Sequence, residues 1–143
     1  MVVRIPASEL VAMAAHGARA FPEEACGFLL GPASSDQGDT RVAEAQPAQN
    51  QKQDERTRRY LIEPQQLMEA DAAAAARGLD IVGFYHSHPT GDAWPSAFDR
   101  AHAWPRYAYV IVAVTAGQPG EVRAWRLAPD RATFVPEAMV QIA

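Results

Sequence analysis

Two histidines separated by a single residue, His86 and His88, follow an apolar run at residues 81–85. The run predicts a buried strand, and side chains at positions i and i+2 of a strand point to the same side. The two imidazoles are therefore expected to converge on one point. The Asp99 carboxylate, eleven residues after His88 and just inside an expected helix, can supply a third ligand. Two imidazoles and a carboxylate suit Zn²⁺, and three protein ligands leave a fourth position for water, as in catalytic zinc sites.

Spacing alone leaves other interpretations of these residues open. The two histidines of an H-x-H pattern are often polar side chains on one exposed face of a strand. Asp99 could instead be an acidic residue in the first turn of a helix that has Ser96 as its N-cap. His102, three residues after Asp99 on the same helical face, is a rival third ligand.

The elements around these residues predict an α/β fold. We expect helices at residues 9–20 (with Ser8 as the cap), 64–77 and 97–104. We expect strands at residues 25–31, 40–46, 60–62, 81–85, 107–115 and 121–127, with weaker elements at 133–135 and 138–142. Residues 47–59 are predicted to form a solvated polar loop, with a partner-binding patch as the alternative for its charged residues. Helices and strands interleave, so residues 1–143 are expected to form a single layered domain.

The wider pattern resembles the JAMM metalloprotease family, also called MPN-plus. The pattern is H-x-H-P, five residues, then P-S-x-x-D, with His86, His88, Pro89, Pro95, Ser96 and Asp99 at its fixed positions. The upstream segment at residues 22–31 is similar to that family's P-x-E-x-C-G-x-L-x-G segment and has Glu24 at the glutamate position. Asn50 and the stretch from Arg59 to Pro64 also look like the small bacterial, Mec-like members.

The resemblance implies a site and a fold. His86, His88 and Asp99 would hold one Zn²⁺ per chain, which would lower the pKa of its bound water toward ~7. Glu24 would take a proton from that water and later deliver it to the leaving amine; Glu23 is the alternative base, one residue out of register. Ser96 would donate a hydrogen bond to the oxyanion. The implied fold is MPN/cytidine-deaminase-like, with a mixed, largely antiparallel sheet flanked by helices.

The resemblance also implies a reaction. The chain would be a zinc-dependent peptidase or isopeptidase that hydrolyses the amide at the C-terminal glycine of a ubiquitin-like sulfur-carrier protein, with release of cysteine as one form of that reaction. The alternative is a non-catalytic MPN-type scaffold that binds proteins; such members usually lack some of the five key residues, and all five are present here. A zinc nucleobase deaminase is set aside because the chain has no P-C-x-x-C pair.

Composition and net charge exclude several other classes of protein function. The formal net charge of −4 argues against binding to nucleic acid or to an anionic membrane. One cysteine, Cys26, excludes an intramolecular disulfide and is expected to be a small core residue. No secretory signal is recognised at the start, and no apolar run reaches the ~18 residues of a membrane-spanning helix. We therefore expect a cytoplasmic protein; the sequence leaves its oligomeric state open.

Overall fold

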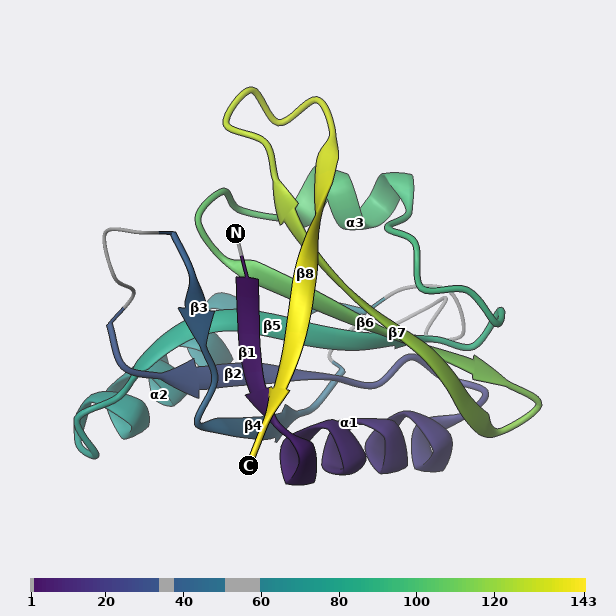
Figure 1. The fold of residues 1–143 in the computed structure, drawn as a ribbon, viewed down its shortest axis with the longest axis horizontal. Helices are drawn as coiled ribbons and strands as arrows, with labels where there is room; N and C mark the ends of the chain where they lie inside the picture. The colour runs from purple at the N-terminus through teal and green to yellow at the C-terminus, as the bar shows by residue number, and fades with distance from the viewer. Residues whose placement is uncertain (1, 34–37, 51–59) are drawn as a thin grey trace.

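The computed structural model describes residues 2–33, 38–50 and 60–143, and places eight strands in one sheet (Figure 1). The helices are α1 (Ala7–Ala20), α2 (Pro64–Ala75) and α3 (Ala97–His102). The strands are β1 (Val2–Pro6), β2 (Cys26–Gly31), β3 (Thr40–Arg41), β4 (Glu44–Ala48), β5 (Asp80–His88), β6 (Ala108–Thr115), β7 (Gln118–Leu127) and β8 (Phe134–Ile142).

The sheet is mixed, with the strand order β3-β1-β8-β7-β6-β5-β2-β4. Among the described strands, four of the seven pairings are antiparallel: β2–β4, β2–β5, β6–β7 and β7–β8. The pairings β1–β3, β1–β8 and β5–β6 are parallel. This confirms the expected α/β class and its mixed, largely antiparallel sheet. In Figure 1, β5 crosses the middle of the molecule between β2 and β6.

Helices cover both faces of the sheet. On one face, Met13 of α1 packs with buried residues that include Leu29 of β2 and Val110 of β6. On the other face, Ala70 and Ala74 of α2 pack in a second cluster with buried aromatic side chains of the sheet. Between these layers, β2 and β6 are buried on both sides, which explains their continuous apolar runs.

The alternation of β5 sends its side chains to opposite layers. Tyr85 belongs to the cluster on the α1 side. Ser87 packs closely against Gly17 of α1: a Cβ added at Gly17 would lie 3.1 Å from the Ser87 Cβ. Phe84 belongs to the cluster on the α2 side, and His86 and His88 share its side of the strand. The strand therefore presents both imidazoles to the layer that contains α2 and α3.

Several sequence expectations need correction. Residues 60–62 are not a strand, and Ser8 does not cap α1, which begins at Ala7 with Pro6 at the N-cap and no side-chain cap. The expected strand at 40–46 is divided into β3 and β4, and the latter continues to Ala48. Residues 51–59 of the predicted loop lie outside the described residues.

The structure of the two terminal strands, β1 and β8, differs from the sequence prediction. β1 was not predicted at all, and it pairs with both β3 and β8. The two weak C-terminal elements form one strand, β8, that passes through Pro136. Proline lacks a backbone N–H, but β1 pairs with β8 only from Ala138 onward, so no bond from Pro136 to β1 is required. Within the described residues, no helix is long and apolar enough to cross a membrane.

Gly83 is a packing constraint just upstream of the two histidines. A Cβ at this position would press against the backbone carbonyl oxygen of Ala108 in β6. We predict that Gly83→Ala lowers the free energy of unfolding by at least about 2 kcal/mol, because the β5–β6 pair must separate to relieve the overlap. Urea denaturation measures this loss.

Gly120→Ala is the matched control in β7. A Cβ added there would lie 3.8 Å from the Ala113 carbonyl oxygen, an ordinary contact. The control variant should unfold within about 0.5 kcal/mol of the parent protein. Equal stability of Gly83→Ala and Gly120→Ala would contradict the packing argument.

Candidate metal centre

The ends of two antiparallel strands bring the proposed base and the two histidines to one place. Cys26, the first residue of β2, pairs with His86 of β5, and Glu24, two residues before β2, lies in the same cluster as the two histidines. Two hydrogen bonds hold this end together: Ser87 N–H donates to the Ala25 carbonyl at 3.0 Å, and Ala25 N–H donates to Ser87 Oγ at 2.8 Å. Ser87, the residue between the two histidines, therefore holds the end of β5 against Ala25, the residue before β2.

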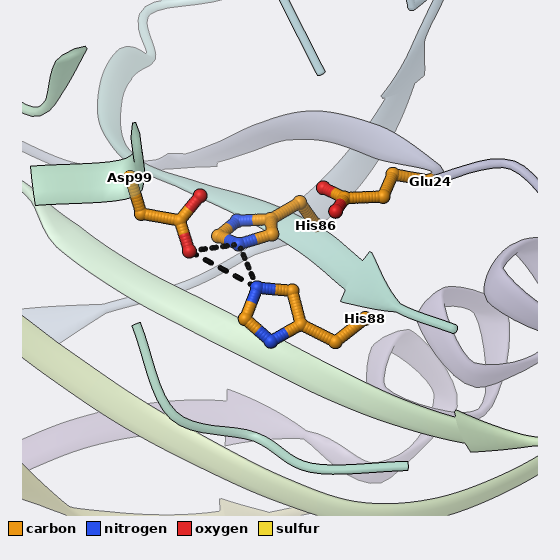
Figure 2. A group of neighbouring side chains, drawn as sticks. All are labelled: Glu24, His86, His88 and Asp99. Atoms are coloured by element: carbon orange, nitrogen blue, oxygen red, sulfur yellow. Dashed lines mark hydrogen bonds and ion pairs between the residues drawn. The ribbon is translucent and has the colours of Figure 1, made fainter. Parts of the chain in front are cut away.

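The proposed ligand atoms converge (Figure 2). His86 Nε2 and His88 Nε2 are 3.1 Å apart, and they lie 3.2 Å and 3.0 Å from Asp99 Oδ2. Adding Glu24, one ligand atom from each of the four residues lies within 4.8 Å of the others, and all four residues are buried. Tetrahedral zinc bonds of about 2.0–2.2 Å place neighbouring ligand atoms roughly 3.4 Å apart. The three-atom triangle therefore fits a zinc-sized cation with little movement.

The short helix α3 aims the Asp99 carboxylate. Ser96 is its N-cap: Asp99 N–H donates to Ser96 Oγ at 3.0 Å, and Ser96 N–H donates to Asp99 Oδ2 at 2.8 Å. This reciprocal pair is a capping box. The same Oδ2 also faces both imidazoles, so the cap fixes the direction of the candidate ligand. Both roles considered for Asp99 in the sequence, helix-capping acid and partner of the histidines, are present together.

Charge coupling within the triangle shifts the pKa values of Asp99 and His88. Burial alone would raise the pKa of Asp99, but the charges and hydrogen bonds of His86 and His88 hold it far below its ordinary value. Burial alone would lower the pKa of His88, but its hydrogen bond to Asp99 and the charges of Asp99, Glu24 and Asp92 raise it overall. The carboxylate is therefore ionised, and the metal-free site favours a proton on His88.

The rival residues lie elsewhere. His102 is exposed, and its Nδ1 lies 2.9 Å from the Phe98 carbonyl oxygen, so it is not part of the buried cluster. Glu23 is also exposed, and it lies in the bend that precedes β2. Cys26 is fully buried, and burial, with the Glu24 charge adding to it, raises the pKa of its thiol to about 12. It is the small core residue that the sequence predicted.

Two residues beside the cluster, Tyr60 and Asn50, were assigned no chemical role in the sequence analysis. The Tyr60 ring stacks on the His86 ring, with centroids 4.5 Å apart and planes 25° apart. Asn50 bridges two segments: its Nδ2 donates to the Glu24 carbonyl at 3.1 Å, and its Oδ1 accepts from Leu61 N–H at 3.1 Å. The resemblance had pointed to both positions, but only the folded chain shows that they meet at the site.

An apolar pocket of about 320 Å³ opens beside the cluster. Asp99 lies in its wall, and the aromatic part of its lining is Tyr60, Phe84, Phe98, Trp104 and Tyr109. The buried polar cluster thus adjoins an apolar surface, a combination typical of binding sites that orient a ligand with a few polar groups.

The fold and the site together define a mixed α/β protein with a candidate metal centre at the end of a central strand. Residues 6–128 match the family model described as prokaryotic homologs of the JAB domain. The chain belongs to this family.

Three relatives illustrate the similarity. A desampylase from Haloferax volcanii is 41% identical over 91 residues, which are 63% of this chain and 62% of that protein. A CysO-cysteine peptidase from Mycobacterium tuberculosis is 32% identical over 141 residues, covering 98% of this chain and 92% of that protein. The solution structure of a protein from Salinibacter ruber is 46% identical, with a TM-score of 0.75, and the match covers 99% of this chain and 92% of that one.

The ligand set predicts which substitutions abolish metal binding. We expect His88→Ala and Asp99→Ala to lose the bound metal, because two protein ligands cannot hold zinc as three do. His102→Ala should bind it as the parent protein does. Elemental analysis after dialysis against a weak chelator measures the metal content per chain.

The variant pair also decides between the two candidate third ligands. Loss of the metal in His102→Ala together with its retention in Asp99→Ala would show that the ligand set is wrong. Asp99→Asn is a useful companion variant, because its amide oxygen can still accept from Ser96 N–H and keep the cap of α3 while the carboxylate charge is lost.

The raised pKa of His88 predicts that zinc binding stabilises the protein more at pH 8 than at pH 5.5. The raised pKa of His88 stabilises the metal-free fold fully below the ordinary value of 6.5, and this contribution is lost as the pH rises through the raised value. The same proton competes with zinc at low pH. Each tenfold gain in affinity adds about 1.4 kcal/mol of stability, or roughly 3–6 °C in Tm. Calorimetry with and without zinc at both pH values tests this; an equal or larger zinc shift at pH 5.5 would contradict it.

Proposed function

We propose that this chain is a zinc-dependent peptidase that hydrolyses the amide bond at the C-terminal glycine of a ubiquitin-like sulfur-carrier protein. The observation that carries the proposal is the buried cluster of Glu24, His86, His88 and Asp99, which combines a three-atom metal triangle with one additional carboxylate. A purely structural zinc site uses four protein ligands and leaves no open position. The fourth residue here is the one to which the resemblance assigns the proton transfer.

Each of these residues has a distinct task in the proposed reaction. His86, His88 and Asp99 would hold the zinc. Bound in such a site, zinc supplies Lewis acidity, which polarises a carbonyl group and makes water more acidic. Glu24 accepts the proton of the attacking water and delivers it to the amide nitrogen as the carbon–nitrogen bond breaks. Glu24 is 4% exposed, so this transfer takes place out of bulk solvent.

Ser96 is proposed to stabilise the oxyanion. Its Oγ accepts a hydrogen bond from Asp99 N–H, and the hydroxyl hydrogen remains available to donate. Its place in the capping box holds it next to Asp99, on the rim of the cluster. A single donor of this kind is typically worth about 3 kcal/mol of transition-state stabilisation.

The names of the relatives support the choice of substrate. Of the two relatives reported above whose names state an activity, the one that matches almost the whole chain is a CysO-cysteine peptidase, and the one with the higher identity is a desampylase. Both names describe removal of a group from a protein. A glycine tail suits the site, because glycine lets a substrate backbone approach buried catalytic groups closely. We further propose that the reaction takes place in the cytoplasm, where the Cys26 thiol stays reduced.

The role of Glu24 makes a sharp prediction. Glu24→Gln should retain zinc, because the three ligands are unchanged, and should lower kcat by at least about 100-fold, because an amide cannot carry the proton. Glu23→Gln, the exposed neighbouring substitution, is the matched control and should keep the parental kcat.

The measurement is mass spectrometry of a glycine-tailed carrier, such as CysO bearing a C-terminal cysteine, before and after incubation with each zinc-loaded protein. Retained turnover in Glu24→Gln would refute the assigned proton transfer. Failure of the zinc-loaded parent protein to cleave this carrier, other glycine-tailed β-grasp carriers or their lysine conjugates would refute the proposed function and favour the alternative, a non-catalytic scaffold.

A further inference from the structure

His86 differs from His88 in how its ring is held. His88 Nδ1 lies 3.4 Å from Asp92 Oδ1, a carboxylate contact on the side of the ring opposite the ligand atom. His86 is 1% exposed, and its Nδ1 has no hydrogen-bond partner among the residues that the structure describes. Metal-ligating histidines almost always donate their second ring N–H to an acceptor, which fixes the orientation of the ring. For His86 the described residues supply no such acceptor.

The Tyr60 ring occupies the position from which the His86 ring can be oriented. The two planes are 25° apart and their centroids are separated by 4.5 Å, which is stacking distance. A stacked ring blocks rotation about χ2 of the histidine, because a turned imidazole would collide with the neighbouring face. Stacking can therefore take over the orienting task that a hydrogen bond performs at His88.

Tyr60 stands in a segment without regular structure, but this segment is tied to the site. Leu61 N–H donates to Asn50 Oδ1, and Asn50 Nδ2 donates to the carbonyl of Glu24. One side chain thus links the main chain next to Tyr60 with the main chain of the proposed base. The link keeps the Tyr60 ring beside His86 although residues 60–62 have no strand partners.

We infer that Tyr60 is a positioning residue of the metal centre: its ring, anchored through Leu61 and Asn50 to Glu24, holds the plane of the His86 imidazole by stacking. The inference rests on the proposed metal site and concerns the ring rather than the phenol hydroxyl. Removing the ring should therefore disturb the metal centre, whereas removing only the hydroxyl should not.

The experiment compares three variants by zinc affinity, measured in competition with a chromophoric chelator, and by the visible absorption spectrum of the Co²⁺-substituted protein. We expect Tyr60→Leu to bind Zn²⁺ on the order of 10-fold or more weakly, with an altered cobalt spectrum. Tyr60→Phe keeps the ring and should match the parent protein within about threefold. Trp104→Leu removes another aromatic wall of the same pocket and should leave both readouts unchanged, because no ring contact joins Trp104 to His86.

Parental zinc affinity and an unaltered cobalt spectrum in Tyr60→Leu would overturn the inference while leaving the proposed function intact. Loss of affinity in Tyr60→Phe equal to that in Tyr60→Leu would overturn it as well, because the hydroxyl would then be the group that matters. Failure of the parent protein to bind zinc would instead refute the proposed function. A second variant, Asn50→Leu, checks the anchor: it should weaken zinc binding in the same direction as Tyr60→Leu, and parental affinity would remove the anchor from the inference.

Discussion

The structure is organised around the burial of two imidazoles at the end of a central strand. Burying a polar ring is costly unless its nitrogens are paired, and a buried carboxylate is more costly still. His86, His88 and Asp99 offset part of this cost together, since one carboxylate oxygen faces the Nε2 atoms of both rings. The arrangement is stable as a proton-sharing group and equally suited to a cation. The same buried triangle therefore accounts for the cohesion of this corner of the fold and for its chemistry.

The two layers that flank β5 have different tasks in supporting this triangle. On the α1 side, Ser87 packs against Gly17 and accepts a backbone hydrogen bond from Ala25. That side fixes the strand itself. On the α3 side, Asp99 closes both a helix cap and the proposed ligand set with one oxygen atom. The helix has only six residues, so the capping box contributes a large part of what holds it in place. A ligand that is also a cap cannot rotate away without loss of its helix.

Much of this arrangement could be predicted from local sequence patterns, and what could not be predicted depends on distant segments. The i, i+2 spacing of the histidines required only strand alternation, and the resemblance of residues 22–31 to the family segment separated Glu24 from Glu23. β1 escaped prediction because its five residues become a strand only by pairing with β3 and β8, which lie far along the chain. The short apolar segment at 60–62 was wrongly predicted as a strand. Its buried surface contacts side chains and does not pair with a neighbouring strand.

Tyr60 lies in a segment without regular structure, and contacts with distant residues hold it in place. Pattern recognition could find Tyr60 and Asn50 as positions, but the Asn50 bridge and the ring stack arise from contacts between three separate parts of the chain. A hydrogen bond orients an imidazole through one donor and one acceptor, whereas a stacked ring does so through shape and tolerates small displacements along the plane. A cation that binds or leaves shifts its ligands by a few tenths of an ångström. A stacked support can follow such a shift, and this suits the proposed role of His86 as a metal ligand in a reaction cycle.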